Sequence, residues 1–230
     1  MNAAIVTVGD ELLVGDTENT NATWLCDRLD ERGVVVRRVT VVPDEVGEIA
    51  RVVNEYYAEY DAVVVTGGLG PTHDDVTMDG VAAAFGRELE TNEEAAAWLA
   101  ERGYSAADLA AETTHLPADC RPLANETGVA PGAVVESVYV LPGVPTEMKA
   151  MFESVADEFE GTPTHTVTVD VDEPESALLD RFTELQDVFD VSVGSYPGES
   201  VRVKITATSA REAERAAEWV RERSTLVDPK

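Results

Sequence analysis

The sequence is short of basic residues, and of lysine most of all. Its 230 residues include 17 lysines and arginines against 45 aspartates and glutamates, so the formal net charge is −28 at pH 7. The lysines are Lys149, Lys204 and Lys230 alone. Proteins bind duplex nucleic acid and anionic membranes through clusters of lysine and arginine. The composition therefore argues against both as partners.

Long hydrophobic runs are absent as well. No apolar run approaches the roughly 18 residues that cross a bilayer. The segment Met1–Leu13 also lacks the basic start and the cleavage site of a secretory signal. A content of 44% hydrophobic residues is ordinary for a globular protein. We therefore expect a folded, cytoplasmic protein.

Cysteine and histidine are too scarce for several kinds of site. Cys26 and Cys120 make neither a disulfide framework nor a zinc site, and Cys26 falls on the apolar face of a predicted helix. His73, His115 and His165 do not have the spacing of metal ligands. No Ser/His/Asp or Cys/His nucleophile arrangement is evident.

Short apolar strands alternate with helices through the first two thirds of the chain. The pattern predicts strands at 3–8, 34–42, 61–66 and 133–141, and helices from Asn19 or Thr20 to Gly33 and at 45–58, 77–85, 92–102, 105–113 and 145–159. The strand Asp61–Thr66 is apolar almost throughout, as in a parallel sheet that is covered on both faces. We therefore predict an α/β fold, a three-layer α/β/α sandwich with a mostly parallel sheet.

The last third follows a different pattern, after a predicted linker at 161–163. Strands are predicted at 165–171, 191–195 and 201–208, and helices at 175–189 and 211–223. This βαββα order predicts a small α+β annex. The predicted domains are residues 1–160 and 165–227.

Three loops carry the residues that suggest chemistry, and each follows a predicted strand, where open α/β sheets bind ligands. The first, Gly9–Asn21, contains two adjacent carboxylates, Asp10 and Glu11, and two amides, Asn19 and Asn21. The alternative is a plain loop in which Asn19 only caps the next helix. Asp44, at the start of another helix, is predicted to act as a cap.

The second loop is TGGLGPTHDDVTMD, Thr66–Asp79. Its glycines allow the main-chain amides to approach a phosphate, and a helix start adds partial positive charge. Carboxylates that follow directly are suitable ligands for Mg²⁺, which could bridge a diphosphate. The alternative is that Asp74 or Asp75 only caps the helix while the glycines only turn the chain.

The third loop, Pro142–Met148, places Pro145 at a helix start. The free amides of that helix start form a second corner that can bind an anion. A tight turn without a ligand is the alternative here.

Taken in order, the motifs GDELLxGxxxNTN, TGGLGPTxDDxT and PGVPxEM resemble the molybdopterin-binding domain of the MoaB/Mog type. More closely, residues 1–160 resemble the N-terminal domain of the competence/damage-inducible CinA family. The annex resembles the KH-like middle domain of that family but lacks the G-x-x-G loop that binds RNA. Longer members end in a nicotinamide-nucleotide amidase domain. Since this chain stops at Lys230, we expect no amidase activity.

The resemblance implies a nucleotide diphosphatase that depends on a divalent metal, Mg²⁺ by preference, and hydrolyses ADP-ribose or a related dinucleotide. The catalytic candidates are Asp10, Asp74 and Asp75. Asp79 joins these three as a metal ligand, with Glu11 as a lesser candidate. The candidates for substrate binding are Gly67, Gly68, Gly70, Thr72, Asn19, Asn21, Gly143 and Pro145.

Two other functions stay open at this point. One is molybdopterin binding or adenylyl transfer in molybdenum-cofactor biosynthesis, which would use the same glycine loop and carboxylates. The other is a non-catalytic nucleotide-binding module. In each case the partner is a small nucleotide or pterin. We expect a homo-oligomer, because the relatives that this resemblance implies are commonly oligomers.

The acidic, lysine-poor composition leads to a first prediction, that the protein is adapted to concentrated salt. Repulsion among 45 acidic side chains opposes the compact state until salt screens it. The Debye length falls to about 3 Å at 1 M salt. We therefore expect the melting temperature, measured by calorimetry, to rise steeply from low salt to molar KCl. A melting temperature that does not change with the KCl concentration would contradict the hypothesis.

Overall fold

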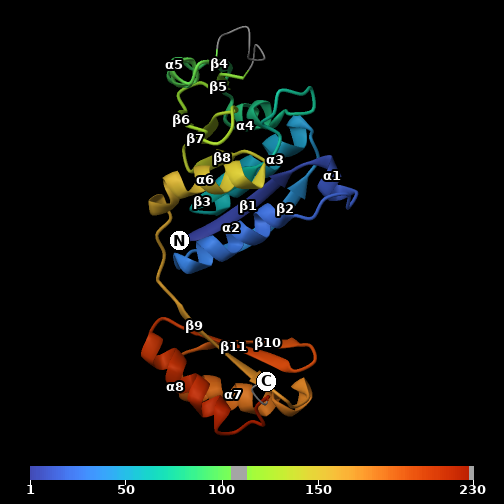
Figure 1. Ribbon diagram of the computed structural model, residues 1–230, viewed down its shortest axis with the longest axis vertical. Helices are drawn as coiled ribbons and strands as arrows, with labels where there is room; N and C mark the ends of the chain where they lie inside the picture. The colour runs from blue at the N-terminus through green and yellow to red at the C-terminus, as the bar shows by residue number, and fades with distance from the viewer. Residues whose placement is uncertain (105–112, 228–230) are drawn as a thin grey trace. The chain divides into compact units, whose positions relative to one another are not determined.

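The computed structural model describes residues 1–104 and 113–227 (Figure 1). The chain divides into two compact units. The first unit comprises Met1–Asp30 and Val34–Gly161, and the second comprises Glu31–Gly33 and Thr162–Lys230. Of the helices in the described ranges, none has the length and apolar character needed to cross a membrane.

The first unit is built on a six-stranded sheet in the order β2-β1-β3-β8-β7-β6. The strands are β1 (Asn2–Val8), β2 (Val35–Val42), β3 (Ala62–Thr66), β6 (Arg121–Leu123), β7 (Gly132–Val135) and β8 (Val138–Leu141). Strand β1 pairs in parallel with β2 and β3, and β3 pairs in parallel with β8, whereas β7 and β6 add an antiparallel edge.

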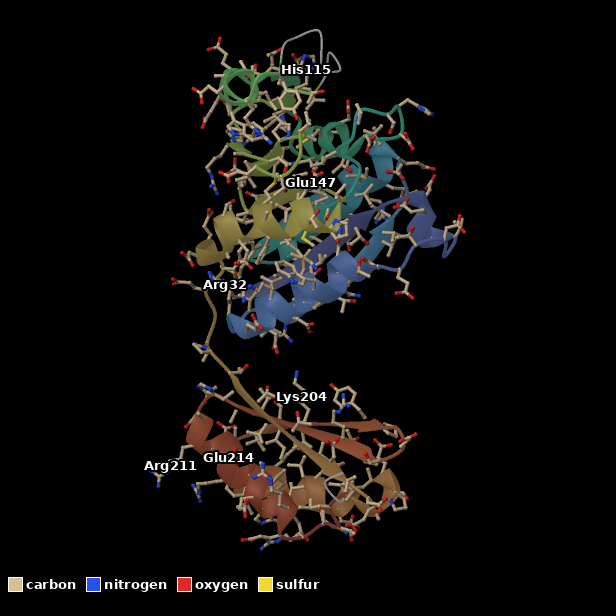
Figure 2. All side chains as sticks on the ribbon, viewed as in Figure 1. Arg32, His115, Glu147, Lys204, Arg211 and Glu214 are labelled. Carbon is tan, nitrogen blue, oxygen red and sulfur yellow. The ribbon has the colours of Figure 1, made fainter. Side chains whose placement is uncertain are left out.

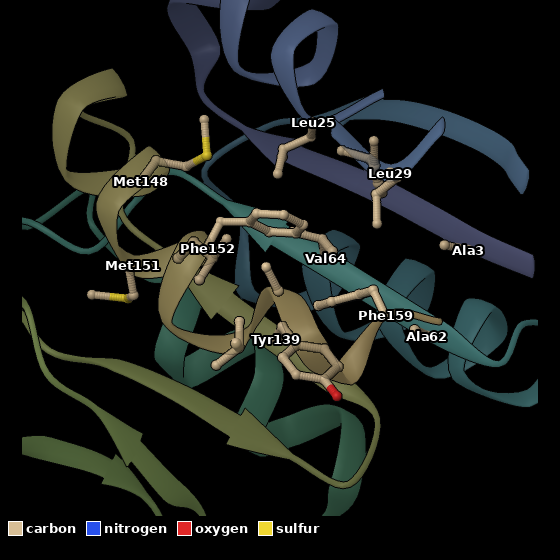
Figure 3. Close-up of a cluster of buried hydrophobic side chains, with 14 of the residues drawn as sticks. Ala3, Leu25, Leu29, Ala62, Val64, Tyr139, Met148, Met151, Phe152 and Phe159 are labelled. Atoms are coloured by element: carbon tan, nitrogen blue, oxygen red, sulfur yellow. The ribbon is translucent and has the colours of Figure 1, made fainter. Parts of the chain in front are cut away.

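Helices cover both faces of this sheet. The helices of this unit are α1 (Asp10–Leu13), α2 (Thr20–Glu31), α3 (Val46–Glu59), α4 (Thr77–Phe85), α5 (Glu93–Glu101), α6 (Pro145–Val155) and the 3-10 helix η1 (Ala156–Glu158), of which α2 and α6 pack in one core and α3 and α4 in the other. Side chains of β3 alternate between two cores, with Val64 packing beside α2 and α6 and Val63 beside α3. Figure 3 shows the first core, where Leu25 of α2 and Phe152 of α6 lie over the sheet. The predicted three-layer sandwich is confirmed.

The single strand predicted at 133–141 is wrong. The segment is a hairpin, because Glu136 adopts a positive φ of 53° and reverses the chain between β7 and β8. Both strands are apolar and buried, so the segment resembles one continuous strand in the sequence, and the two-residue turn between them was not predicted. The turn is what gives the sheet its antiparallel edge.

A small addition lies beyond this edge of the sheet. Strands β4 (Leu89–Thr91) and β5 (His115–Pro117) pair antiparallel, and α5 follows β4. The side chain of Asn92 caps α5 by accepting a hydrogen bond from the Ala95 amide at 3.0 Å. The helix predicted at 105–113 lies outside the described residues except for Thr113, which is in a turn.

The second unit has the predicted βαββα order. Its elements are β9 (His165–Val171), the 3-10 helix η2 (Glu175–Ala177), α7 (Leu179–Val188), β10 (Ser192–Pro197), β11 (Val201–Ala207) and α8 (Ala210–Arg221). The sheet is antiparallel in the order β10-β11-β9. Glu173 accepts hydrogen bonds from Arg181 of α7 and from the Thr225 amide, and these bonds lower the pKa of Glu173 to about 2. Glu173 thus links the segment at Thr225 to α7.

Both cysteines are free and half-buried. Cys26 of α2 packs against the core, as predicted from its position on the apolar helix face. Burial raises the pKa of both thiols, so neither is activated as a thiolate.

Candidate functional site

The carboxyl ends of β1, β3 and β8 meet at Gly67. This residue has a φ of 107°, and a Cβ built on it would lie 2.1 Å from the carbonyl oxygen of Val8 at the end of β1. A Cβ built on Gly143, after β8, would lie 3.2 Å from the Cα of Gly67. Only glycine allows three strand ends to approach this closely.

A cavity of about 230 Å³ opens at this junction, and we call it the strand-end cavity. Its lining comes from the loops after β1, β2, β3 and β8 and from the starts of α2 and α6. The lining residues are Thr7, Val8, Gly9, Glu11, Leu12, Thr17, Glu18, Asn19, Thr20, Asn21, Asp44, Thr66, Gly67, Gly68, Asp74, Asp75, Gly143 and Pro145. All three loops that the sequence singles out therefore reach one cavity.

A second cavity of about 360 Å³ adjoins it, and we call it the side cavity. It shares Gly68 and Asp75 with the strand-end cavity. Its lining residues are Gly68, Leu69, Gly70, Pro71, Thr72, Asp75, Met78, Asp79, Leu89, Thr113, His115, Leu116, Ala130 and Pro131. His115 lies on β5, in the small addition beyond the sheet (Figure 2).

The glycine turn presents unpaired amides. Among the described residues, the N–H groups of Gly68, Leu69 and Gly70 donate to no protein acceptor. The N–H of Gly67 instead donates to the Leu141 carbonyl at 3.2 Å, so it extends the sheet and is not free for a ligand. Successive free amides in such a turn form a concavity that binds anions.

The two asparagines of the first loop have structural partners. Asn19 accepts from the Ala22 amide at 3.2 Å and donates to the Thr7 hydroxyl at 2.9 Å, so it caps α2 and also lines the strand-end cavity. Asn21 donates to the Gly143 carbonyl at 2.7 Å and to the Thr66 hydroxyl at 3.3 Å. Its Oδ1 atom is buried and has no partner in the described part of the chain. Asn21 thus joins α2 to the other strand ends and keeps one acceptor facing inward.

The predicted carboxylates do not form one set. Asp74 and Asp75 line the strand-end cavity, Asp79 lines the side cavity, and Asp10 lines neither. The amide of Asp10 donates to the Asp44 carboxylate at 2.9 Å. Thr72 is also engaged, since its amide and its hydroxyl both donate to Asp75. Residues 1–104 and 113–227 contain no group of three or more acidic, histidine or cysteine side chains placed to hold a metal ion.

Asp44 is the site residue that the sequence reasoning missed. It lines the strand-end cavity, and its carboxylate faces Asp10, Glu11 and Asp74. Partial burial, with a further contribution from these three charges, raises the pKa of Asp44 above its ordinary value, although the hydrogen bond from Asp10 opposes the shift. The one sequence signal was its position directly after a predicted parallel strand.

Comparison with known proteins adds family relationships to this geometry. Residues 4–160 match the model of a family described as probable molybdopterin binding domain, and residues 163–226 match one described as FAD synthase, middle domain. A protein of Archaeoglobus fulgidus is 37% identical over 232 residues, with 100% of each chain covered. A protein of Aeropyrum pernix is 41% identical over 94% of this chain and 88% of its own.

A solved structure of a CinA protein is also similar. The crystal structure of the protein CinA, of unknown function, from Thermoplasma acidophilum superposes with a TM-score of 0.64 and 38% sequence identity. The match covers 70% of this chain and 99% of that chain.

The raised pKa of Asp44 leads to a stability prediction. The ordinary pKa of an aspartate is 3.8, and the pKa of Asp44 in the folded protein is higher. Ionised Asp44 therefore lowers the stability of the fold, and this destabilisation disappears once the pH falls below both pKa values. We expect Asp44→Asn to raise the melting temperature at pH 7, with the gain shrinking toward zero below about pH 4. The amide side chain of this variant keeps an oxygen that can accept from the Asp10 amide.

Asp16→Asn is the matched control, because Asp16 is an exposed acid on the loop after β1 and lines neither cavity. Thermal melts of both variants from pH 3 to pH 8 test the prediction. It is contradicted if Asp44→Asn gains no more than Asp16→Asn.

Proposed function

Because this chain belongs to the family of probable molybdopterin binding domains, the MoaB/Mog-type family that its motifs predict, we propose that the strand-end cavity binds a phosphorylated pterin of the molybdopterin type. The observation that carries the proposal is the row of free amides at Gly68, Leu69 and Gly70. A terminal phosphate presents oxygens to such a row, and the starts of α2 and α6 add partial positive charge on other sides of the cavity.

The strand-end cavity has two chemically different halves. Free main-chain amides make one half, and the carboxylates of Glu11, Asp44, Asp74 and Asp75 make the other. A bare phosphate is attracted by the first half and repelled by the second. A divalent cation that enters with the ligand would satisfy both halves, so the affinity for a phosphorylated pterin should increase when Mg²⁺ is added.

The glycine turn provides the test of this proposal. Gly68 has a φ of 64°, and a Cβ on it would lie 2.4 Å from the Thr77 hydroxyl oxygen. We expect Gly68→Ala to displace the free amides and to weaken binding of neopterin monophosphate by about tenfold or more, since a strained residue costs about 1–3 kcal/mol. Isothermal titration calorimetry measures the affinity.

Gly86→Ala is the matched control. Gly86 has nearly the same φ, 61°, but nothing lies within 4 Å of a Cβ built there, and the residue lines neither cavity. Both variants therefore place an alanine in the strained left-handed conformation, but only Gly68→Ala disturbs the free amides. Equal affinities in the two variants would reject the role of the turn, and wild-type protein that binds no phosphorylated pterin would reject the proposal itself.

The acidic half favours a second candidate, hydrolysis of ADP-ribose or a related dinucleotide with Mg²⁺. Mg²⁺ is commonly held by one or two carboxylates together with substrate phosphates, so a complete protein cage is not required. Asp75, with Asp44 or Asp74, would supply the protein ligands and the diphosphate would supply the others. The metal would neutralise charge on the diphosphate and help a water to attack it.

For this candidate, wild-type protein with Mg²⁺ and ADP-ribose should release AMP and ribose 5-phosphate, measured by chromatography. We expect Asp75→Asn to lower the rate by about 100-fold while circular dichroism shows an intact fold, because a metal ligand is lost. Asp16→Asn should keep the wild-type rate. Release of AMP that survives in Asp75→Asn, or that proceeds equally with a chelator, would remove the hydrolase candidate and leave the binding proposal standing.

A further inference from the structure

Strand β2 contains a β-bulge at the edge of the six-stranded sheet. Among the described residues, β1 alone pairs with this strand. Ala3 of β1 pairs with Val36. The next residue, Ala4, pairs with Arg38, so Arg37 is the extra residue of the bulge. Successive side chains of a regular strand point to opposite faces, and a bulge interrupts this alternation and can redirect a side chain.

Both arginines at the bulge line one cavity of about 350 Å³, which we call the edge cavity. Its lining residues are Asn2, Arg37, Arg38, Glu59 and Tyr60, and none of them lines the strand-end cavity or the side cavity. Asn2 begins β1, whereas Val8 at the other end of this strand lines the strand-end cavity. The edge cavity is therefore a separate place in the first unit.

Each of the two arginines is oriented through its Nε atom. Nε of Arg37 donates to the side-chain oxygen of Asn2 at 2.9 Å, and Nε of Arg38 donates to the Tyr60 hydroxyl at 3.4 Å. Within residues 1–104 and 113–227, the terminal nitrogens of both guanidinium groups have no acceptor. The protein thus holds the two side chains in place and leaves their outer N–H groups for another partner.

This arrangement differs from that of many other arginines in the chain, which form ion pairs with carboxylates. These are Arg28, Arg51, Arg87, Arg121, Arg181, Arg202, Arg221 and Arg223. Acidic partners are plentiful in a chain with a net charge of −28, yet Arg37 and Arg38 form no ion pair with a described residue. Glu59 also lines the edge cavity, so one net positive charge remains there for an anion.

The geometry of two guanidinium groups favours a tetrahedral anion. A guanidinium is a planar fork that matches two oxygens of a carboxylate or a phosphate. One fork satisfies both oxygens of a carboxylate, whereas two forks can bind different oxygens of one phosphate. Because the arginines supply the positive charge themselves, a phosphate bound here needs no metal ion.

Charge and a bulge at a sheet edge also have a structural explanation. Both protect an edge strand from pairing with another chain, and the exposed Val35 and Val39 make such protection useful on β2. Protection alone requires only that the charges reach water. It does not account for two Nε atoms that bond to the protein and direct both arginines to one cavity.

We propose that the edge cavity binds a phosphate group, as the free anion or in a small monoester, through Arg37 and Arg38 and without a metal ion. The proposal does not rest on the proposed function, because the edge cavity shares no residue with the strand-end cavity. The protein would then have two anion sites of opposite kinds, one built on main-chain amides and one on arginine side chains.

The experiment is calorimetry with inorganic phosphate on the full chain, in EDTA and at one fixed KCl concentration. EDTA removes the divalent cations that would help a phosphate to enter the acidic strand-end cavity. We expect Arg37→Gln and Arg38→Gln each to weaken phosphate binding by about tenfold, because each removes charge-assisted hydrogen bonds.

Arg51→Gln is the matched control. Arg51 is an exposed arginine of α3, its loss changes the net charge by the same amount, and it lines none of the three cavities. This variant should bind phosphate as the wild type does. If Arg51→Gln weakens binding as much as Arg37→Gln, the total charge of the protein decides the affinity and the edge site is overturned.

Arg37→Lys separates a site with defined geometry from a patch of positive charge. Lysine keeps the charge but lacks the planar fork. We expect the affinity of this variant for phosphate to lie between those of the wild type and Arg37→Gln. An affinity equal to that of the wild type would overturn the two-fork geometry.

Acetate and AMP define the class of ligand. Acetate should bind more weakly than phosphate, and equal affinities would overturn the preference for a tetrahedral anion. If AMP binds more tightly than phosphate and Arg37→Gln weakens that binding, the occupant is a monoester. Equal affinities of AMP and phosphate, both weakened by Arg37→Gln, support the free anion.

Three further results would overturn the edge site. One is a wild-type protein that binds no phosphate in EDTA, which leaves the proposed function standing because that function is tested with Mg²⁺. Another is an Arg37→Gln protein that self-associates in light scattering but binds phosphate as Arg51→Gln does, since this would show edge protection alone. The third is binding in EDTA that Gly68→Ala weakens, which would place the phosphate on the glycine turn.

Discussion

The site depends on the close approach of three strand ends at Gly67. Any side chain at this position would enter the space of the Val8 carbonyl, so β1 and β3 could not end side by side. The Gly67 amide completes the ladder to β8 through Leu141, and Asn21 adds a polar link to the Gly143 carbonyl. The amides that follow Gly67 are left without protein partners because the chain must turn away from the sheet here. The candidate ligand site is thus a consequence of how the parallel sheet ends.

The fold could be predicted from the sequence because its signals are local. The apolar run of β3 identifies a strand without other information, and the glycine that follows α2 identifies the end of a helix. The three-layer sandwich then follows from the alternation of strands and helices. The hairpin at Glu136 could not be predicted in this way, because its turn has neither glycine nor asparagine and lies within one apolar run. A positive φ at glutamate is held by the pairing of β7 with β8, which is a tertiary effect.

The candidate site was predicted as three loops, and the structure brings all three to one cavity, but the roles of single residues required coordinates. Asp44 resembles a helix cap in the sequence, whereas its carboxylate accepts from the Asp10 amide, 34 positions away. Asp79 lies in the first turn of α4, whereas Asp75 precedes this helix and accepts from the Thr72 amide, although both carboxylates line the side cavity. The spacing of residues in the sequence gives distances along a helix, but it cannot show which carboxylates already accept hydrogen bonds within their own loop.

The acidity of the whole chain and the acidity of the site have different consequences. Repulsion between exposed surface acids acts over a Debye length, which shrinks from about 10 Å at 0.1 M salt to about 3 Å at 1 M, so concentrated salt removes most of it. The interaction of Asp44 with its neighbouring acids is short-range and partly buried, and so is the contact that the free amides would make with a phosphate, so salt screens both less. A highly acidic protein in concentrated salt can therefore bind an anionic ligand. Under the proposed function the obstacle that remains is local, at Glu11, Asp44, Asp74 and Asp75, where a cation would have to accompany the phosphate.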